Sequence, residues 1–421
     1  MGLVRRAVSL AGVPLGAGAR MAGAAGRAAL GADRTAAYDK ATQASVDALV
    51  TTLAKVRGPA MKFGQALAVF SSALPPELAD KLESLSRLYE QADPLPFAKV
   101  APLLSVLPAG VDVEEQAVAA ASLGQVHRAT WTDGRPVAVK LRYPDAPRAV
   151  RSDMAQLRAM SPLLSRLLPS LDLRALLDEH AARLTEELDY EFEAGWMHRF
   201  AQGWQDSFVH VPAVVHASES VLVTEWLDGV PFTEIVSRGS REQRDAAGSM
   251  LCEFTFASPR RVFAIHADPH PGNFRLMPDG RLGVLDFGSV GAGAGLFTQL
   301  FATTASYAAS GKGEEIRQAW VEAGLADEAT STESLMDLLD VDTRIWTQPE
   351  FTFSTEWLST SASRWTDPGA ALEGVSRLRF PPSYLLEHRA VMGTLALASS
   401  LGATVPMRRI LDDVLDEAGP L

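Results

Sequence analysis

The stretch from Phe263 to Gly291 constrains the fold of this chain more than any other part of the sequence. Within it, His266 and Asp268 are followed, after four further residues, by Asn273, which gives an H-x-D-x-x-x-x-N spacing. Asp286-Phe287-Gly288 comes next and forms a D-F-G motif. Either motif alone is compatible with an ordinary turn, but both in this order are far rarer. The stretch therefore predicts a site in which carboxylates and an amide act together.

The residues between the two motifs predict a β-hairpin. Two short apolar runs flank Pro278-Asp279-Gly280, a sequence typical of a tight turn. Because a hairpin returns the chain to its start, we expect Asn273 and Asp286 to lie close together and to share Mg²⁺ on nucleotide phosphates. Asp268 would then orient or deprotonate an acceptor. The pattern predicts phosphoryl transfer.

The length of the chain and its hydrophobic content predict two lobes. With 421 residues, of which 47% are hydrophobic, the chain can bury a large core and exceeds the usual size of one domain. The single cysteine, Cys252, excludes an internal disulfide framework and lies in an apolar run. It therefore predicts a buried structural thiol rather than a reactive one, which fits a reducing compartment.

The net charge of -12 is distributed unevenly. Residues 1–34 contain five arginines and one aspartate, or +4, which leaves -16 for the remainder. We therefore expect no nucleic-acid binding by the body of the protein. No window offers the roughly 20 predominantly apolar residues of a membrane span. We expect no transmembrane helix and a cytoplasmic location.

Residues 1–34 are rich in Gly, Ala and Arg and are the first predicted segment. This composition suits a helix lying on an anionic membrane surface, and it also resembles an organellar transit peptide. A disordered leader is an equally open alternative. If the surface interpretation holds, the arm gives the protein peripheral contact with anionic membranes.

Residues 35–115 predict a helical N-terminal extension. Phe63, Leu67 and Phe70 recur at helical spacing and form one apolar stripe. Lys62 and Gln65 fall off that stripe. Periodicity alone therefore makes Lys62 a solvated lysine.

Residues 116–228 predict a smaller lobe with strands and a helical insertion. Alternating runs on either side of Thr132-Asp133-Gly134 predict a strand pair. The second strand carries Lys140 in a V-A-V-K pattern, whose lysine holds nucleotide phosphates, although the alternative is an exposed strand edge. An alanine-rich turn precedes the pair, and a hinge follows at Asp228-Gly229. The residues that we assign to nucleotide binding are Ala120, Ala121, Ser122, Gly124, Lys140 and Glu225.

Residues 145–200 predict helices with five carboxylates crowded between positions 186 and 193. Acids at this density repel one another unless cations approach them, and Lys62 and Lys140 are candidate cations. The alternative is an acidic solvated face. Residues 229–421 predict a largely helical lobe that contains both motifs.

Together these residues resemble the UbiB/ABC1/ADCK (AarF-type) family of atypical kinases, over roughly residues 50–300. The shared features, in chain order, are K-x-G-Q with Lys62 and Gln65, Ser-Leu-Gly-Gln-Val-His from Ser122 to His127, the strand lysine Lys140, E-x-D with Glu187 and Asp189, the helix glutamate Glu193, H-x-D-P-H-P-G-N and D-F-G. K-x-G-Q is the specific feature, because ordinary protein kinases lack it.

The resemblance implies an α+β, protein-kinase-like two-lobed fold with a helical N-terminal extension and a largely helical C-lobe. It implies binding of ATP or ADP with Mg²⁺, with Lys140 and Glu193 at the phosphates and Asp268 as a catalytic residue. It also implies a role in isoprenoid quinone or other lipid metabolism, with a lipid or quinone precursor as a further ligand.

The resemblance assigns a regulatory role to the K-x-G-Q and E-x-D motifs. It implies that Lys62, with Gln65 in the same motif, folds over the nucleotide pocket toward Glu187 and Asp189 and blocks protein substrates. Many relatives carry a hydrophobic C-terminal anchor that this sequence lacks, so we expect no stable membrane integration.

Two functional hypotheses from different classes stay open. The leading one is an atypical kinase or ATPase that acts on ATP. The alternative is a nucleotide-gated scaffold that binds ATP or ADP and regulates lipid or protein partners without useful turnover. An ordinary protein kinase is disfavoured, because the sequence has neither G-x-G-x-x-G before Lys140 nor A-P-E after the D-F-G motif.

Overall fold

The computed structural model of the protein describes residues 94–120, 123–167, 173–293, 295–339, 344–365 and 382–418. The predicted arm and nearly all of the predicted helical extension lie outside the described residues. Four predicted site residues also lie outside them: Lys62, Gln65, Ala121 and Ser122.

The chain divides into two compact units. One unit comprises residues up to Val106 together with Glu114–His127 and Lys140–Leu188. The other comprises Leu107–Val113, Arg128–Val139 and Asp189–Leu421. The domain boundaries expected from the sequence stay predictions.

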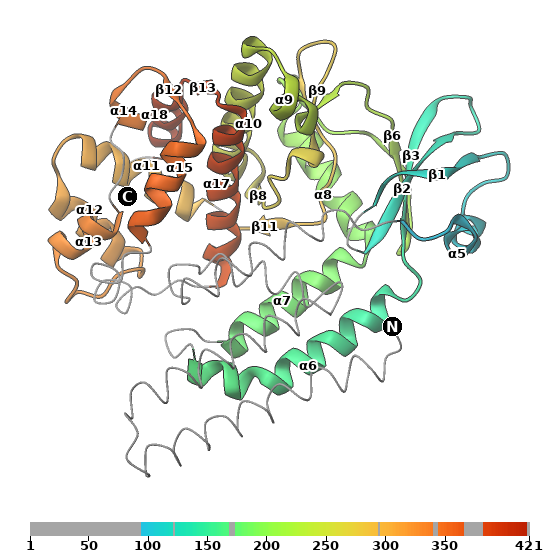
Figure 1. The fold of residues 1–421 in the computed structure, drawn as a ribbon, viewed down its shortest axis with the longest axis horizontal. Coiled ribbons are helices and arrows are strands. Elements are labelled where there is room, and N and C mark those ends of the chain that lie inside the picture. The colour runs from blue at the N-terminus through green and yellow to red at the C-terminus, as the bar shows by residue number, and fades with distance from the viewer. Residues whose placement is uncertain are drawn as a thin grey trace. The chain divides into compact units, whose positions relative to one another are not determined.

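Groups of strands and groups of helices follow one another up to residue 292, and helices dominate the described chain after that point (Figure 1). The strands are β1 (Asp112–Ala120), β2 (Gly124–Thr130), β3 (Pro136–Arg142), β4 (Val209–His210), β5 (Val214–Ala217), β6 (Val221–Glu225), β7 (Val230–Pro231), β8 (Ala264–His266), β9 (Phe274–Leu276), β10 (Leu282–Val284), β11 (Val290–Ala292), β12 (Phe351–Thr352) and β13 (Thr404–Val405). The helices are α5 (Phe97–Val100), η2 (Ala101–Val106), α6 (Ala146–Leu167), α7 (Leu173–Glu187), α8 (Tyr190–Gly203), α9 (Phe232–Arg238), α10 (Arg241–Val262), η3 (Pro271–Asn273), α11 (Leu296–Ala309), α12 (Gly313–Glu322), α13 (Thr332–Leu339), α14 (Arg344–Thr347), α15 (Thr355–Trp365), α17 (Pro382–Leu401) and α18 (Met407–Ala418).

A five-stranded sheet with the order β1-β2-β3-β6-β5 contains the predicted strand pair as β2 and β3. The sheet and the helical C-terminal region confirm the α+β, kinase-like fold. Strand β1 was not predicted, because most of its side chains are exposed and it shows no apolar alternation. Ala120, which was predicted to lie in the alanine-rich turn, is instead the last residue of β1.

The predicted hairpin between the two motifs is confirmed. Strands β9 and β10 pair antiparallel, with Leu276 opposite Leu282 and Phe274 opposite Val284. The turn reverses at Gly280, whose φ of 84° lies in the left-handed region that glycine adopts without steric cost. The Asp279 carboxylate accepts the backbone N–H of Arg281 at 3.0 Å and stabilises the turn.

The start of α8 explains part of the acidic cluster. Asp189 is the N-cap of this helix, and its carboxylate accepts the backbone N–H of Glu191 at 3.0 Å. Glu191 and Glu193 lie in the first turn, where the helix dipole favours negative charge. A helix terminus therefore stabilises three of the five acids locally.

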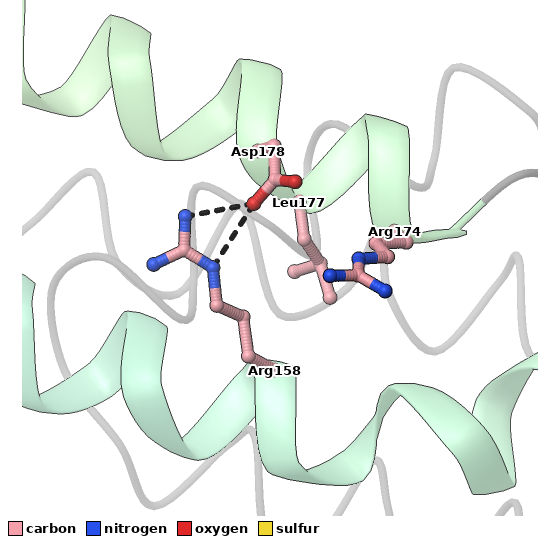
Figure 2. A pocket seen from close by; sticks show the side chains of 4 residues that line it. All are labelled: Arg158, Arg174, Leu177 and Asp178. Atoms are coloured by element: carbon pink, nitrogen blue, oxygen red, sulfur yellow. Dashed lines mark hydrogen bonds and ion pairs between the residues drawn. The ribbon is translucent and has the colours of Figure 1, made fainter.

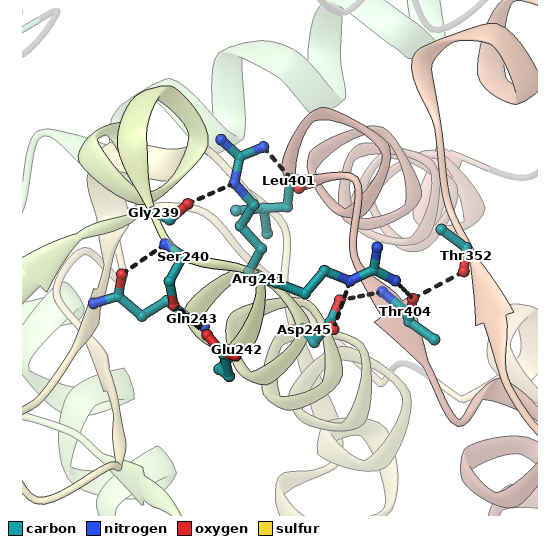
Figure 3. A network of polar contacts seen from close by, with 10 residues as sticks. Gly239, Ser240, Arg241, Glu242, Gln243, Asp245, Thr352, Leu401 and Thr404 are labelled. Atoms are coloured by element: carbon teal, nitrogen blue, oxygen red, sulfur yellow. Dashed lines mark hydrogen bonds and ion pairs between the residues drawn. The ribbon is translucent and has the colours of Figure 1, made fainter.

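Helix α10 is the centre of the C-terminal region, and it lies beside α17 in Figure 1. It begins with a capping box between Ser240 and Gln243. Asp245 accepts the backbone N–H of Thr404 at 2.7 Å, and Figure 3 shows this contact beside the capping box. Cys252 is fully buried in α10, and burial raises the pKa of its thiol to about 12. The thiol is thus structural, as predicted.

Candidate active site

The open end of the β9–β10 hairpin brings the two motifs together. The backbone N–H of Leu285 donates to the carbonyl oxygen of Asn273 at 2.9 Å, which places Asp286 directly after the pairing. The side chain of Asn273 binds the other motif residue: its Nδ2 donates to the carboxylate of Asp268 at 2.9 Å and to the backbone carbonyl oxygen of Asp268 at 3.0 Å. Asp268, Asn273 and Asp286 therefore belong to one constellation, as the spacing predicted.

Two hydrogen bonds hold the backbone of the D-F-G motif. The ring Nε2 of His266 donates to the carbonyl oxygen of Asp286. On the other side, the backbone N–H of Phe287 donates to Glu193 Oε1 at 3.3 Å. Burial lowers the pKa of His266, so its ring stays neutral at physiological pH and keeps one tautomer.

Phe287 fixes the motif through packing. Its side chain is fully buried, and its ring centroid lies 5.0 Å from that of Phe200 in α8 and 5.4 Å from that of His266. Phe254 of α10 and Phe274 of β9 complete an aromatic cluster around the His266 ring. Close packing on all sides leaves the D-F-G backbone little freedom to rearrange.

Arg389 of α17 makes an ion pair with the candidate catalytic carboxylate. Its Nη2 lies 2.7 Å from Asp268 Oδ1, and both side chains are 37% exposed. The Asn273 amide binds the other oxygen, Oδ2. Two donors from different elements therefore hold the Asp268 carboxylate.

Glu387, two residues before Arg389, holds the segment that follows the D-F-G motif. Its carboxylate accepts the backbone N–H of Gly295 at 3.2 Å and that of Phe297 at 2.8 Å, so it caps the start of α11 from another helix. Glu387 is buried, and burial raises the pKa of its carboxyl group although the N–H donors oppose that shift.

The other predicted site residues lie in regular elements near the ends of strands or helices. Gly124 begins β2, and Lys140 is a half-buried residue of β3. Glu187 is the last residue of α7. Glu225 ends β6, and its Oε2 accepts a hydrogen bond from His210 Nε2 at 3.1 Å and one from the backbone N–H of Ala213 at 3.2 Å. Its carboxylate therefore links the end of β6 to His210 of β4 and to the chain before β5.

The donor set of Asn273 and Asp286 fits Mg²⁺. Both Asn273 hydrogen bonds are donated by Nδ2, so its Oδ1 is the atom that can bind a cation. One carboxylate oxygen of Asp286, Oδ1, accepts the N–H of Gly288 at 2.8 Å, which orients the group. Within the described ranges, no cluster of three or more His, Cys, Asp or Glu side chains could hold a metal unaided. Mg²⁺ is commonly bound by one or two protein oxygens together with phosphates and water.

A separate cavity of about 300 Å³ lies between α6 and α7. Figure 2 shows Arg158 of α6 reaching Asp178 of α7, with Arg174 and Leu177 beside them. The lining contains none of the residues predicted for catalysis or for binding the nucleotide. This cavity is therefore not the candidate active site.

Helices long and apolar enough to cross a lipid bilayer do not occur in the part of the chain that the structure describes.

Sequence reasoning missed Arg389 and Glu387. Each is a charged residue in a helix with no motif around it, and Arg389 lies 121 residues after its partner Asp268. Glu387 is buried, which is unusual for a carboxylate, but neither its burial nor its partners can be identified without the fold.

Residues 111–319 match the model of the ABC1 atypical kinase-like domain. The chain is 32% identical over 278 residues to the mitochondrial atypical kinase coq-8 of Caenorhabditis elegans, covering 62% of this chain and 36% of that protein. It is 33% identical over 243 residues to the chloroplastic Activity of BC1 complex kinase 3 of Arabidopsis thaliana, covering 54% and 34%.

A solved structure is similar over nearly the whole chain. It is the complex of Rv3197 from Mycobacterium tuberculosis with erythromycin, at 33% identity and a TM-score of 0.67, and the match covers 92% of this chain and 99% of that one. The chain spans about a quarter to three fifths of the length of the curated relatives it matches.

Proposed function

Because the chain belongs to the ABC1 atypical kinase-like family, we propose that it binds ATP or ADP with Mg²⁺. We propose further that it transfers the γ-phosphoryl group of ATP either to an acceptor molecule or to water. The observation that carries this proposal is the meeting of Asp268, Asn273 and Asp286 at the open end of the β9–β10 hairpin. These are the oxygen and amide groups that phosphoryl transfer requires.

Each residue has a separate role in the proposed reaction. Asp286 and the Asn273 Oδ1 hold the cation, which neutralises the charge that develops on the phosphates. Lys140 and Glu193 hold the nucleotide phosphates. Asp268 orients the attacking hydroxyl or water and takes its proton. The hydrogen bond from Phe287 to Glu193 supports this arrangement, because it ties the helix glutamate to the D-F-G backbone.

The proposal extends to the class of phosphoryl acceptor and to the metabolic pathway. The resemblance to UbiB-type kinases supports a role in isoprenoid quinone or other lipid metabolism, with a quinone precursor or lipid at the site. The solved relative in complex with erythromycin supports testing a macrolide as a further ligand. We propose that the protein acts in a reducing compartment, with contact to anionic membranes through residues 1–34.

A thermal-shift titration with Mg-ATP tests the binding step. Asp286→Asn keeps the side-chain shape but removes the charge that holds the cation, so we expect it to lose most of the Mg-dependent stabilisation. Asp412→Asn is the matched control, because Asp412 is an exposed partner of Arg408 on α18. Equal stabilisation of Asp286→Asn and the wild type by Mg-ATP would reject the assignment of Asp286.

Turnover separates the enzyme from the scaffold alternative. ATP hydrolysis is measured with and without anionic liposomes, quinone-precursor mimics and erythromycin. An enzyme should show a rate that one of these additions raises and that Asp268→Asn removes. Nucleotide binding without a rate above the Asp268→Asn background favours the nucleotide-gated scaffold.

A further inference from the structure

Helix α17 contacts both segments on which the proposed chemistry depends. Arg389 pairs with Asp268 in the loop after β8, and Glu387 binds the chain that follows the D-F-G motif. One helical turn after Arg389, Gly393 faces Pro269 of the same loop. We call residues 387–393 of this helix the α17 clamp.

Hydrogen bonds with α10 fix the register of α17 at several positions along the helix. Thr394 shares a buried hydrogen bond of 2.8 Å with Thr255 of α10. At the C-terminal end of α17, Arg244 of α10 donates to the carbonyl oxygen of Leu401 at 3.3 Å and to that of Gly239 at 3.1 Å. The ends of α10 and α17 and strands β12 and β13 meet in the network of Figure 3. The position of α17 therefore determines which groups the Arg389 guanidinium can contact.

Gly393 lets the helix approach the catalytic loop closely. A Cβ at this position would lie 2.4 Å from Pro269 Cγ, which is shorter than any real contact. Only a residue without a side chain fits here. This close approach brings Arg389, four residues earlier on the same face, within hydrogen-bond distance of Asp268.

The contact between Arg389 and Asp268 is suited to orientation rather than to stability. The pair is partly exposed, so solvent screens it and it contributes little to the free energy of unfolding. Its geometry is specific, since Arg389 binds Oδ1 while Asn273 binds Oδ2. Donors on the two oxygens fix the plane of the carboxylate.

The segment after the D-F-G motif is short and is held by the same helix. Strand β11 pairs antiparallel with β8, and α11 begins at Leu296, ten residues after Asp286. Glu387 caps that helix start. In protein kinases a phosphorylated activation loop commonly organises this region. Here a helix from the C-terminal part of the chain makes the contacts.

We propose that Arg389 is a positioning residue for Asp268, and that the α17 clamp orders the catalytic loop. This inference rests on the proposed phosphoryl transfer and adds a residue to it. Arg389 acts through Asp268: it aims the carboxylate at the acceptor, while Asn273 remains available to the cation through Oδ1.

Steady-state ATP hydrolysis by the full chain tests the proposal with four variants: Arg389→Ala, Arg389→Lys, Asp268→Asn and the double variant Arg389→Ala/Asp268→Asn. Arg408→Ala is the matched control, because Arg408 also forms an ion pair on a C-terminal helix but lies away from the loop. Thermal unfolding and Mg-ATP thermal shifts are recorded for each protein, so that loss of fold or of nucleotide binding is seen separately.

We expect Arg389→Ala to lower kcat on the order of 10- to 100-fold with an unchanged KM for Mg-ATP, because misoriented catalytic groups cost rate rather than binding. Arg389→Lys should recover part of the rate. In the Asp268→Asn background, Arg389→Ala should have no further effect, because the two residues act as one unit. The control should match the wild type.

Three results would overturn the positioning role. They are a kcat of Arg389→Ala equal to or above that of the wild type, full additivity with Asp268→Asn, and a parallel loss of kcat, Mg-ATP binding and thermal stability that lysine does not recover. A wild type that shows no Mg-ATP thermal shift contradicts the proposed function itself. A wild type that binds Mg-ATP without turnover overturns both the positioning role and the phosphoryl transfer, in favour of the scaffold.

Discussion

Gly393 of α17 packs directly on Pro269 of the catalytic loop, with 2.4 Å between the Pro269 Cγ and the place where a Cβ of residue 393 would lie. Two elements far apart in the sequence thus touch with only the Pro269 ring between their backbones. The geometry of the loop therefore depends on the position of a helix near the C-terminus, and changes in that helix should be felt at the candidate site.

Replacing Gly393 by alanine should separate α17 from the loop. We expect Gly393→Ala to lower the free energy of unfolding by about 1–3 kcal/mol, as for other overpacked sites, and to lower ATP turnover. Gly195→Ala in α8 is the control: nothing lies within 4 Å of its added Cβ, so helix propensity should make it neutral or slightly stabilising. Equal stability of the two variants in urea unfolding would show that the loop adjusts without cost.

We expect Glu387→Gln to preserve the free energy of unfolding and Glu387→Ala to lower it. Burial raises its folded pKa above the ordinary value of 4.5, so the folded state binds a proton more readily than the unfolded state. The contribution of Glu387 to stability therefore falls as the pH rises above about 4.5. Glu387→Gln keeps acceptors for Gly295 and Phe297, and we expect it to be at least as stable as the wild type at pH 8.

Glu387→Ala leaves the buried N–H of Phe297 and the partly buried N–H of Gly295 without their acceptor and should lose about 1–3 kcal/mol. Urea unfolding at pH 5 and pH 8 checks both variants. A glutamine variant much less stable than the wild type at pH 8 would show that the charge of Glu387 is needed.

His388 should make the fold sensitive to acid. Burial lowers the pKa of His388 from 6.5 to about 4. Between these values the unfolded chain binds a proton that the folded chain does not, so the free energy of unfolding falls as the pH drops from 6.5 to about 4. The loss should reach about 3 kcal/mol. The difference between the wild type and His388→Gln in urea unfolding from pH 7.5 to 4.5 isolates this contribution; parallel curves would contradict it.

The regulatory role of Lys62 remains a prediction from the resemblance, since Lys62 lies outside the described residues. If Lys62 pairs with Glu187 at the nucleotide pocket, Lys62→Ala should alter nucleotide affinity or allow autophosphorylation, and Glu187→Gln should act in parallel. A double-mutant cycle on nucleotide binding should then give a coupling of about 2–5 kcal/mol if the pair is buried. A coupling near zero would show that Lys62 is a solvated surface residue, as periodicity predicts.

Deletion of residues 1–34 should weaken binding to anionic liposomes and leave nucleotide affinity unchanged. The segment carries a net charge of +4, and basic residues near an anionic surface contribute about 1 kcal/mol each. Co-sedimentation at low salt, with zwitterionic vesicles as the control, measures the effect. Identical sedimentation of the full chain and of the deletion variant would show that residues 1–34 do not contribute to membrane binding.

The sequence alone determined the hairpin, the approach of Asn273 to the D-F-G motif, and the buried thiol. These features depend on contacts between residues close in the chain: Pro278-Asp279-Gly280 fixes the turn, and the turn brings Asn273 to Asp286. Local geometry leaves little choice in such cases. The kinase-like fold was also identified from the sequence, because its motifs occur in a fixed order.

Only the tertiary structure decided which residues support the site. Asp189 lies in an acidic cluster from which the sequence suggested a cation partner, and the structure also makes it the N-cap of α8. Arg389 reaches Asp268 across 121 positions, and Glu387 reaches Phe297 across 90. No periodicity encodes these pairings, because they depend on how α17 packs on α10 and on the absence of a side chain at Gly393. Long-range packing, which local patterns do not specify, sets the orientation of Asp268.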